Sequence, residues 1–291
     1  TGTSTRGNSG GIQLSTGAAT QGRAGGIALV VGRGDTGAGG DVVLVAGRTT
    51  DSAAAGGNVA ISSGRSLHKS SGSIRVATAN AGVAGASGLL SLTTGTTSAG
   101  ASGALSLLTG AAHGGPGGNI DLGVGAGNRG NGGDVRIAAG RTAGKNSAGG
   151  RVQIMAGRGT NDAGGRGGDV EISAGTAHGL SPKTSPGGNV RISGGTAARS
   201  TGGSIALVSG HGVASTSGSL MLRTANAGAS GVSGNVRLLT GRASNGPSGN
   251  VRIRTGTSVG GHGGNVDIGV GAGTAGHGGD VHLHAGETTA G

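Results

Sequence analysis

Residues 133–140 read Gly133-Asp134-Val135-Arg136-Ile137-Ala138-Ala139-Gly140. In this motif a glycine is followed two residues later by Val, Ile or Leu, and a second aliphatic residue comes two positions further on. Eighteen copies follow one another along the 291-residue chain, most of them 15 residues apart. The first aliphatic residue of each copy, called position i below, is Ile12, Ile27, Val42, Val59, Ile74, Leu90, Leu105, Ile120, Val135, Val152, Val170, Val190, Ile205, Leu220, Val236, Val251, Val266 or Val281. Such a short fixed period with apolar alternation is typical of a solenoid, in which each repeat buries its apolar face against its neighbours.

The composition excludes several classes of protein. The chain has 75 Gly, 11% charged residues and no Phe, Tyr, Trp or Cys, so it lacks the side chains from which a globular core or an enzyme pocket is usually built. Collagen is excluded because glycine is not found at every third position and only four Pro are present. Disorder is disfavoured because the aliphatic residues keep their phase in every copy. No catalytic constellation recurs, and we expect neither an enzyme nor a cofactor.

We therefore predict an all-β fold, a single continuous β-solenoid of about 18 coils over residues 1–291. Fifteen residues at about 3.3 Å each give a circuit of roughly 50 Å, enough for two short strands and two turns, so the coil would be thin and two-layered. Positions i and i+2 would face inward, as Val135 and Ile137 do in the quoted copy, and i+1 and i+3 would face outward. The glycine at i−2, such as Gly133, is expected at positive φ or in close backbone contact.

A longer period lies above the short one. The copies in 59–141 recur 146 residues later in 205–287, which predicts a duplicated block of nine coils. Longer intervals between copies fall within 141–188, and these are expected to be looped insertions in one continuous domain. Neither end shows the polar or helical cap that usually covers a solenoid's open edge, so we expect self-association through the open ends.

The net charge of +11 points to an anionic partner. Several arginines share position i+6, and stacked coils would space their guanidinium groups about 4.8 Å apart, which suits an anionic polysaccharide. Nucleic acid is disfavoured because there are no aromatic side chains to stack on bases. A role in solubility alone explains the charge equally well. The residues of this predicted ladder are Arg33, Arg48, Arg65, Arg141 and Arg158.

His282 and His284 are the candidates for a metal site. They occupy i+1 and i+3 of the last copy, so both imidazoles would project from one face about 7 Å apart. Exposed polar side chains are the ordinary explanation for such a pair. Elsewhere the sequence offers no repeated set of metal ligands.

The repeat unit resembles the glycine-rich short-coil β-solenoid repeats of extracellular fibres and adhesins. Its consensus is Ser/Gly-Gly-x-Val-x-Leu-x-Thr/Ala-Gly. The resemblance covers nearly the whole chain. It is to this class of repeat and not to a particular protein. It implies a structural or adhesive role outside the cell or at its surface, without a cofactor. We expect a building block of an extracellular filament or surface layer, assembled by end-to-end stacking.

The alternative function is an adhesin, or binding module, that engages anionic glycan. Ice binding is less favoured, because the threonines at i+4 would point inward. No run of apolar residues is long enough to span a bilayer.

Overall fold

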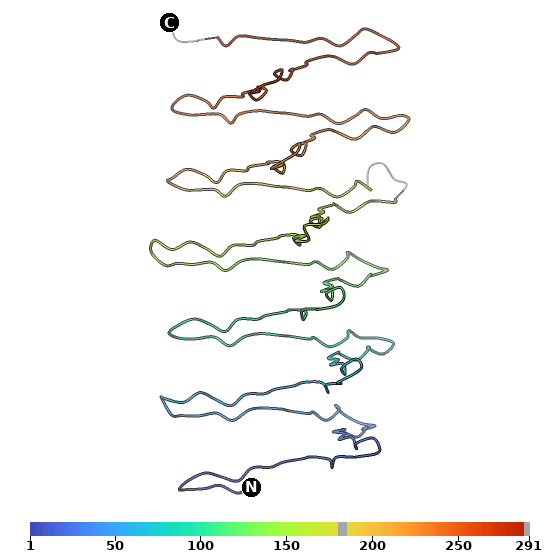
Figure 1. Cartoon of the computed structure of the whole chain (residues 1–291), viewed down its shortest axis with the longest axis vertical. Coiled ribbons are helices and arrows are strands. Elements are labelled where there is room, and N and C mark those ends of the chain that lie inside the picture. The colour runs from blue at the N-terminus through green and yellow to red at the C-terminus, as the bar shows by residue number, and fades with distance from the viewer. Residues whose placement is uncertain (180–184, 288–291) are drawn as a thin grey trace. The chain divides into compact units, whose positions relative to one another are not determined.

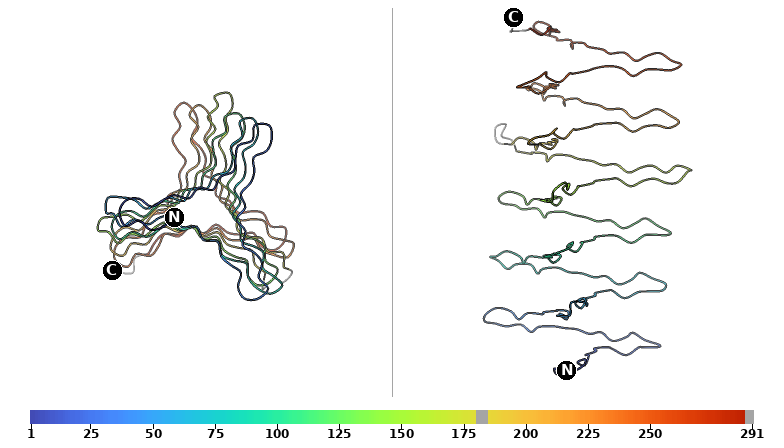
Figure 2. Two further views of the ribbon diagram at one scale, coloured as in Figure 1. Left: turned by 90° about the horizontal axis from the view of Figure 1, so that it is seen from below. Right: turned by 90° about the vertical axis from the view of Figure 1, so that its left-hand side faces the viewer.

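The computed structural model describes residues 1–179 and 185–287. Within these ranges there is no helix and no β-strand, and the backbone is an extended coil interrupted by bends and turns. The chain groups into two units, Thr1–Arg136 and Ile137–Gly291. Each unit repeats the same two parts, an extended segment (positions i−2 to i+5 of a copy) and a loop that leads to the next segment (Figure 1). Figure 2 shows this alternation of segments and loops from two further directions.

The prediction of an all-β, two-layered β-solenoid is therefore wrong. In the described residues no strands pair and no hydrophobic side chain is buried; Val135 and Ile137, predicted to face inward, are 60% and 69% exposed. The accessible surface is 29510 Å² for 26.7 kDa. A compact chain of this mass would expose about 10,700 Å² and an unfolded one about 39,000 Å². The part of the chain that the structure describes thus forms no internal core that could hold coils together.

Backbone hydrogen bonds in the described residues are few and local. Twelve backbone–backbone bonds form, and the longest in sequence joins Gly188 to Gly175. A folded globular protein has about one internal hydrogen bond per residue, two-thirds of them between backbone groups. The segments therefore leave most of their N–H and C=O groups open to solvent, which costs nothing in water but provides no fold stability.

Each loop is narrow where one segment ends and the next begins. At all seventeen junctions between copies, the residue at i+4 lies against the glycine at i−2 of the following copy. A methyl group on Gly88, for example, would lie 3.5 Å from Thr78 Cγ2, and one on Gly57 would lie 3.4 Å from Ala46 Cβ. We call this junction the neck of the loop.

Necks have two forms, and the side chain at i+4 distinguishes them. Seven necks are closed by a hydrogen bond of 2.8–2.9 Å, in which the i−2 glycine N–H donates to the carbonyl oxygen at i+5 of the preceding copy. The other ten, all within the described ranges, have Thr or Val at i+4 and form no such bond. The i+4 residues of the closed necks are Ala46, Ser63, Ala139, Ala156, Ala174, Gly194 and Ser209.

Steric bulk at Cβ explains the two forms. The second γ-atom of a β-branched side chain occupies the space between the two segments and keeps their backbones apart. Loop length is not the cause, because the glycines at the base of the loop are eight positions apart both at the closed Ser63 neck and at the open Thr94 neck. Three of the closed-neck residues, Ala46, Ala139 and Ala174, are among the few half-buried residues of the chain.

The close contact expected at Gly133 is present, but with a side chain and not with backbone. This glycine does not have a positive φ, but a methyl group on it would lie 2.8 Å from Val124 Cγ1 across the neck. Positive φ is found instead at the tip of the same loop, where Gly130 has φ +73°. Elsewhere the loops are held by turn residues: Asp51 Oδ1 accepts from the N–H of Ala53 at 2.9 Å.

Candidate functional site

The most extensive candidate surface is the row of exposed aliphatic side chains. Side chains at position i are 50–79% exposed and those at i+2 are 58–88% exposed. Because alternate side chains of an extended backbone point the same way, each segment presents its two aliphatic residues together. The row recurs in all eighteen copies, and nothing in residues 1–179 and 185–287 buries it.

One segment is aliphatic on both sides. Val42, Val43, Leu44 and Val45 follow one another, and they are 60%, 75%, 69% and 84% exposed. In most other copies a polar or small residue separates the aliphatic positions. Six-residue stretches with high β propensity and low charge are those that pair most readily between chains.

The predicted arginines recur at one place in the loops. Arg48, Arg65, Arg141 and Arg158 each follow the glycine whose carbonyl oxygen closes a neck, so each is the first residue beyond it. Arg33 follows Gly32 at an open neck, where Val31 lies against Gly40. All five are exposed. The 4.8 Å ladder that we expected required stacked coils, which the described residues do not form, and a contact with a polyanion stays a prediction.

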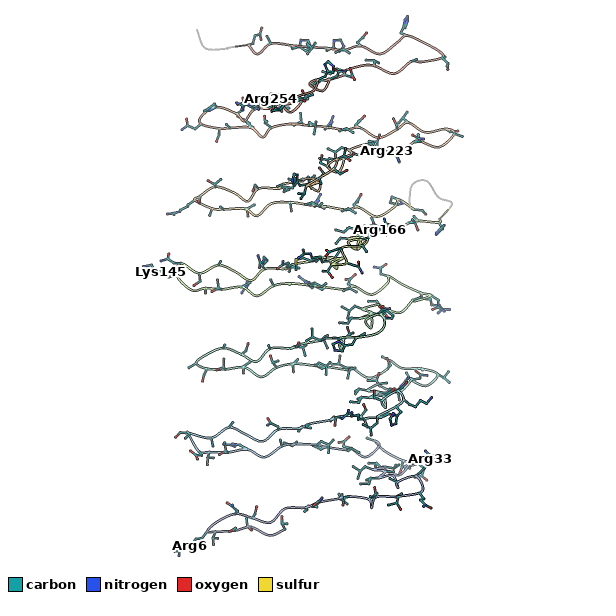
Figure 3. The ribbon with its side chains drawn as sticks, in the orientation of Figure 1. Arg6, Arg33, Lys145, Arg166, Arg223 and Arg254 are labelled. Carbon is teal, nitrogen blue, oxygen red and sulfur yellow. The ribbon has the colours of Figure 1, made fainter. Side chains whose placement is uncertain are left out.

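Arg242 occupies the same position and was missed. It follows Gly241 at i+6 of the copy that begins at Val236, so the spacing used for the other arginines would have found it. Figure 3 labels Arg33 of this set and five other basic residues, Arg6 in the same unit and Lys145, Arg166, Arg223 and Arg254 in the other unit. Within each unit the labelled side chains come from separate parts of the chain.

The structure brings the two candidate metal ligands together. The rings of His282 and His284 are stacked, with centroids 6.1 Å apart and planes inclined by 13°. Asp280 Oδ2 lies 3.8 Å from His282 Nε2, and both side chains are largely exposed. Over the described ranges, no three His, Cys, Asp or Glu side chains gather around a point where a metal ion could bind.

Hollows in the surface are shallow and open. One is lined by Arg141, Thr142 and Ala143, and another by residues between Thr1 and Ser9. Thr142 Oγ1 is engaged locally, since it accepts from the N–H of Gly144 at 3.1 Å. The residues that line these two hollows include no His, Asp, Glu or Lys side chain to act as a general base, so neither hollow carries a catalytic proposal.

No family model matches this chain, and no curated protein or solved structure is significantly similar to it. The resemblance to short-coil solenoid repeats therefore stays an observation on the sequence motif. In the part of the chain that the structure describes, no helix is long and apolar enough to cross a membrane.

Proposed function

We propose that the chain is a structural protein whose copies associate with one another and bury their aliphatic rows between chains. The observation that carries this proposal is the combination of a strictly phased aliphatic pattern with at least half exposure of every residue in it. Val, Ile or Leu occupies i and i+2 in all eighteen copies, and an exposed apolar surface of this extent is typical of an interaction site. Since the described residues do not cover it, a second copy with the same period is the natural partner.

The energetics favour such an association. Full burial of a Val, Leu or Ile side chain contributes about 1.5–3 kcal/mol. With roughly half to two-thirds of each side chain still exposed, burial between chains would contribute about 1–2 kcal/mol per residue. The surface in excess of a compact fold is far larger than the roughly 1,600 Å² of a standard interface. Unpaired backbone groups of the segments would add hydrogen bonds between chains.

This proposal changes the assembly mode that the sequence predicted. End-to-end stacking required terminal solenoid coils with unpaired strand edges, and the described residues contain no β-strands. The exposed groups lie along every segment, so association is lateral and yields fibres or layers. We place this material outside the cell or at its surface because of the resemblance to fibre and adhesin repeats, and we propose no enzymatic role and no cofactor.

The test compares two neighbouring charge substitutions in the same segment. Ile137→Asp places a carboxylate in the aliphatic row, where burial between chains would leave it without a partner at a cost of several kcal/mol. Arg136→Asp introduces the same group at the neighbouring i+1 position. We expect light scattering to show a raised critical concentration for the first variant and little change for the second. Equal behaviour of both variants would contradict burial of the row.

A second candidate function is the binding of anionic glycan. It is favoured by the placement of Arg48, Arg65, Arg141 and Arg158 directly after closed necks, which repeats one cation at one place in the loop. Replacing these four arginines with Gln should weaken heparin binding and its salt dependence more than replacing the segment residues Arg75, Arg136, Arg191 and Arg237. Equal losses would show that only the net charge matters.

A further inference from the structure

The last segment, 279–286, carries three side chains with metal-binding atoms at alternate positions. Asp280, His282 and His284 occupy i−1, i+1 and i+3, so an extended backbone directs them to the same side. The structure shows the expected neighbourhood: the two imidazoles are stacked, and the carboxylate of Asp280 lies beside His282.

This set is specific to one copy. The equivalent segment 146 residues earlier has Asp134, Arg136 and Ala138 at the same three positions. The duplication therefore preserves the aspartate and differs at both sites where His stands in the last segment. None of the other seventeen copies has two imidazoles at i+1 and i+3. Neither the turns nor the repeat pattern explains the His282–His284 pair, since the other copies form the same segments and loops without two histidines.

We propose that His282 and His284 together bind a divalent transition metal ion of the imidazole-preferring class, with Cu²⁺ bound most tightly. Neutral imidazole is a ligand for copper, zinc and nickel, and Cu²⁺ stands highest in the affinity order for such sites. At metal–nitrogen distances of about 2.0–2.1 Å, two imidazoles on one ion have ring centroids roughly 4.5–6.5 Å apart. The centroid distance of 6.1 Å lies in this range.

Only side-chain rotation is needed to complete the geometry. The rings are nearly parallel, and turning them about their χ2 angles directs one nitrogen of each toward a common point. Both side chains are exposed, His282 with 72% of its side chain in solvent, so both rings are free to turn. The backbone, which sets the separation of the two rings, would not have to move.

Asp280 acts as a positioning residue in this site. Metal-bound histidines usually donate their second ring N–H to a carboxylate or carbonyl, which fixes the ring orientation and raises the basicity of the ligand. Asp280 Oδ2 lies 3.8 Å from His282 Nε2, so a small rotation makes this hydrogen bond and leaves Nδ1 for the metal ion. As no third ligand gathers there in the described residues, one chain supplies two imidazoles and water completes the coordination. The site does not depend on the proposed self-association.

The experiment is a Cu²⁺ titration of the full chain, at a protein concentration low enough to keep it monomeric, followed by calorimetry and electron paramagnetic resonance. We expect one site per chain that is tighter than the rest, with hyperfine structure from two imidazole nitrogens. His282→Ala and His284→Ala should each weaken this site at least about tenfold, and Asp280→Asn should weaken it by up to about tenfold. The matched controls His277→Ala and His262→Ala, both exposed loop residues, should leave it unchanged.

Two results would overturn the proposal. One is a wild-type affinity no greater than that of a chain with both His282 and His284 replaced by Ala. The other is an equal loss of affinity in the His277 and His262 controls, which would indicate scattered binding by single imidazoles. Since all these side chains are exposed, the substitutions leave the chain conformation intact and each outcome reports on the metal site alone.

Discussion

The difference between Ser and Thr at position i+4, a single methyl group, should decide whether the backbone hydrogen bond of a neck forms. Ser63 forms a closed neck in which the Gly72 N–H donates to the Gly64 carbonyl oxygen at 2.9 Å. Thr94 forms an open neck over a loop of the same length, and a methyl group on Gly103 would lie 3.6 Å from Thr94 Cγ2. We predict that Ser63→Thr opens the first neck and that Thr94→Ser closes the second.

The magnitude follows from the one bond that changes. A backbone hydrogen bond contributes about 0.5–1.5 kcal/mol net, and 1.4 kcal/mol is a factor of ten, so amide exchange should change about two- to twelvefold. Ser63→Thr should speed exchange of the Gly72 N–H, and Thr94→Ser should slow that of Gly103. The measurement is hydrogen exchange of both glycine amides by NMR, with the unaltered Gly218 amide of the duplicate Ser209 neck as internal reference. Unchanged exchange in both variants would refute the steric explanation of the two neck forms.

Two further predictions concern the Gly pair before a segment and the doubly aliphatic segment. Gly133→Ala should shift the NMR signals of Val124, because the new methyl group would lie 2.8 Å from Val124 Cγ1, whereas Gly132→Ala meets nothing within 4 Å and should not; similar shifts in both variants would contradict the assigned neck. Val43→Lys should slow association measured by light scattering several-fold more than Ala60→Lys at the same position of the next copy, since Val43 is 75% exposed within four consecutive aliphatic residues. Equal rates would mean that this segment has no special part in assembly.

The sequence pattern predicted the local organisation of the chain correctly where it depended on neighbours in sequence. The constant glycine at i−2 indicated a close approach, and the structure places Gly133 against Val124 and Gly57 against Ala46. The i+4 side chains were expected to face a core together with i and i+2, but the described residues have no core, and Thr78 instead lies against Gly88 at a neck. Both features depend on steric contacts between residues about ten positions apart, which a single copy and its loop determine.

The predicted core failed for a physical reason. The alternation of aliphatic residues predicts that Val135 and Ile137 share a face. It does not predict which surface covers that face. A solenoid covers that face with the next coil of the same chain, and an assembling fibre covers it with another chain, so the two cases have the same sequence period. The size of the neck residue was a usable signal that we did not interpret: Ala, Ser or Gly at i+4 identifies the closed necks.

The candidate site residues could be found from spacing, but not their arrangement. Position i+6 identified Arg48 and Arg141, and the same spacing identifies Arg242. Their expected 4.8 Å separation depended on paired strands and had no basis once these were absent. For His282 and His284, alternation predicted a shared face, and the stacked rings agree with it.

The central claim is that the aliphatic rows are buried between chains and not within one. The most direct test is a dilution series in which sedimentation velocity gives the assembled fraction and far-ultraviolet circular dichroism gives the backbone conformation of the same samples. We predict that the single chain shows no β signal and no cooperative thermal transition, and that a β signal grows in proportion to the assembled fraction. A monomeric chain with a full β signal and cooperative unfolding would contradict the claim, because it would show that one chain covers its own aliphatic residues.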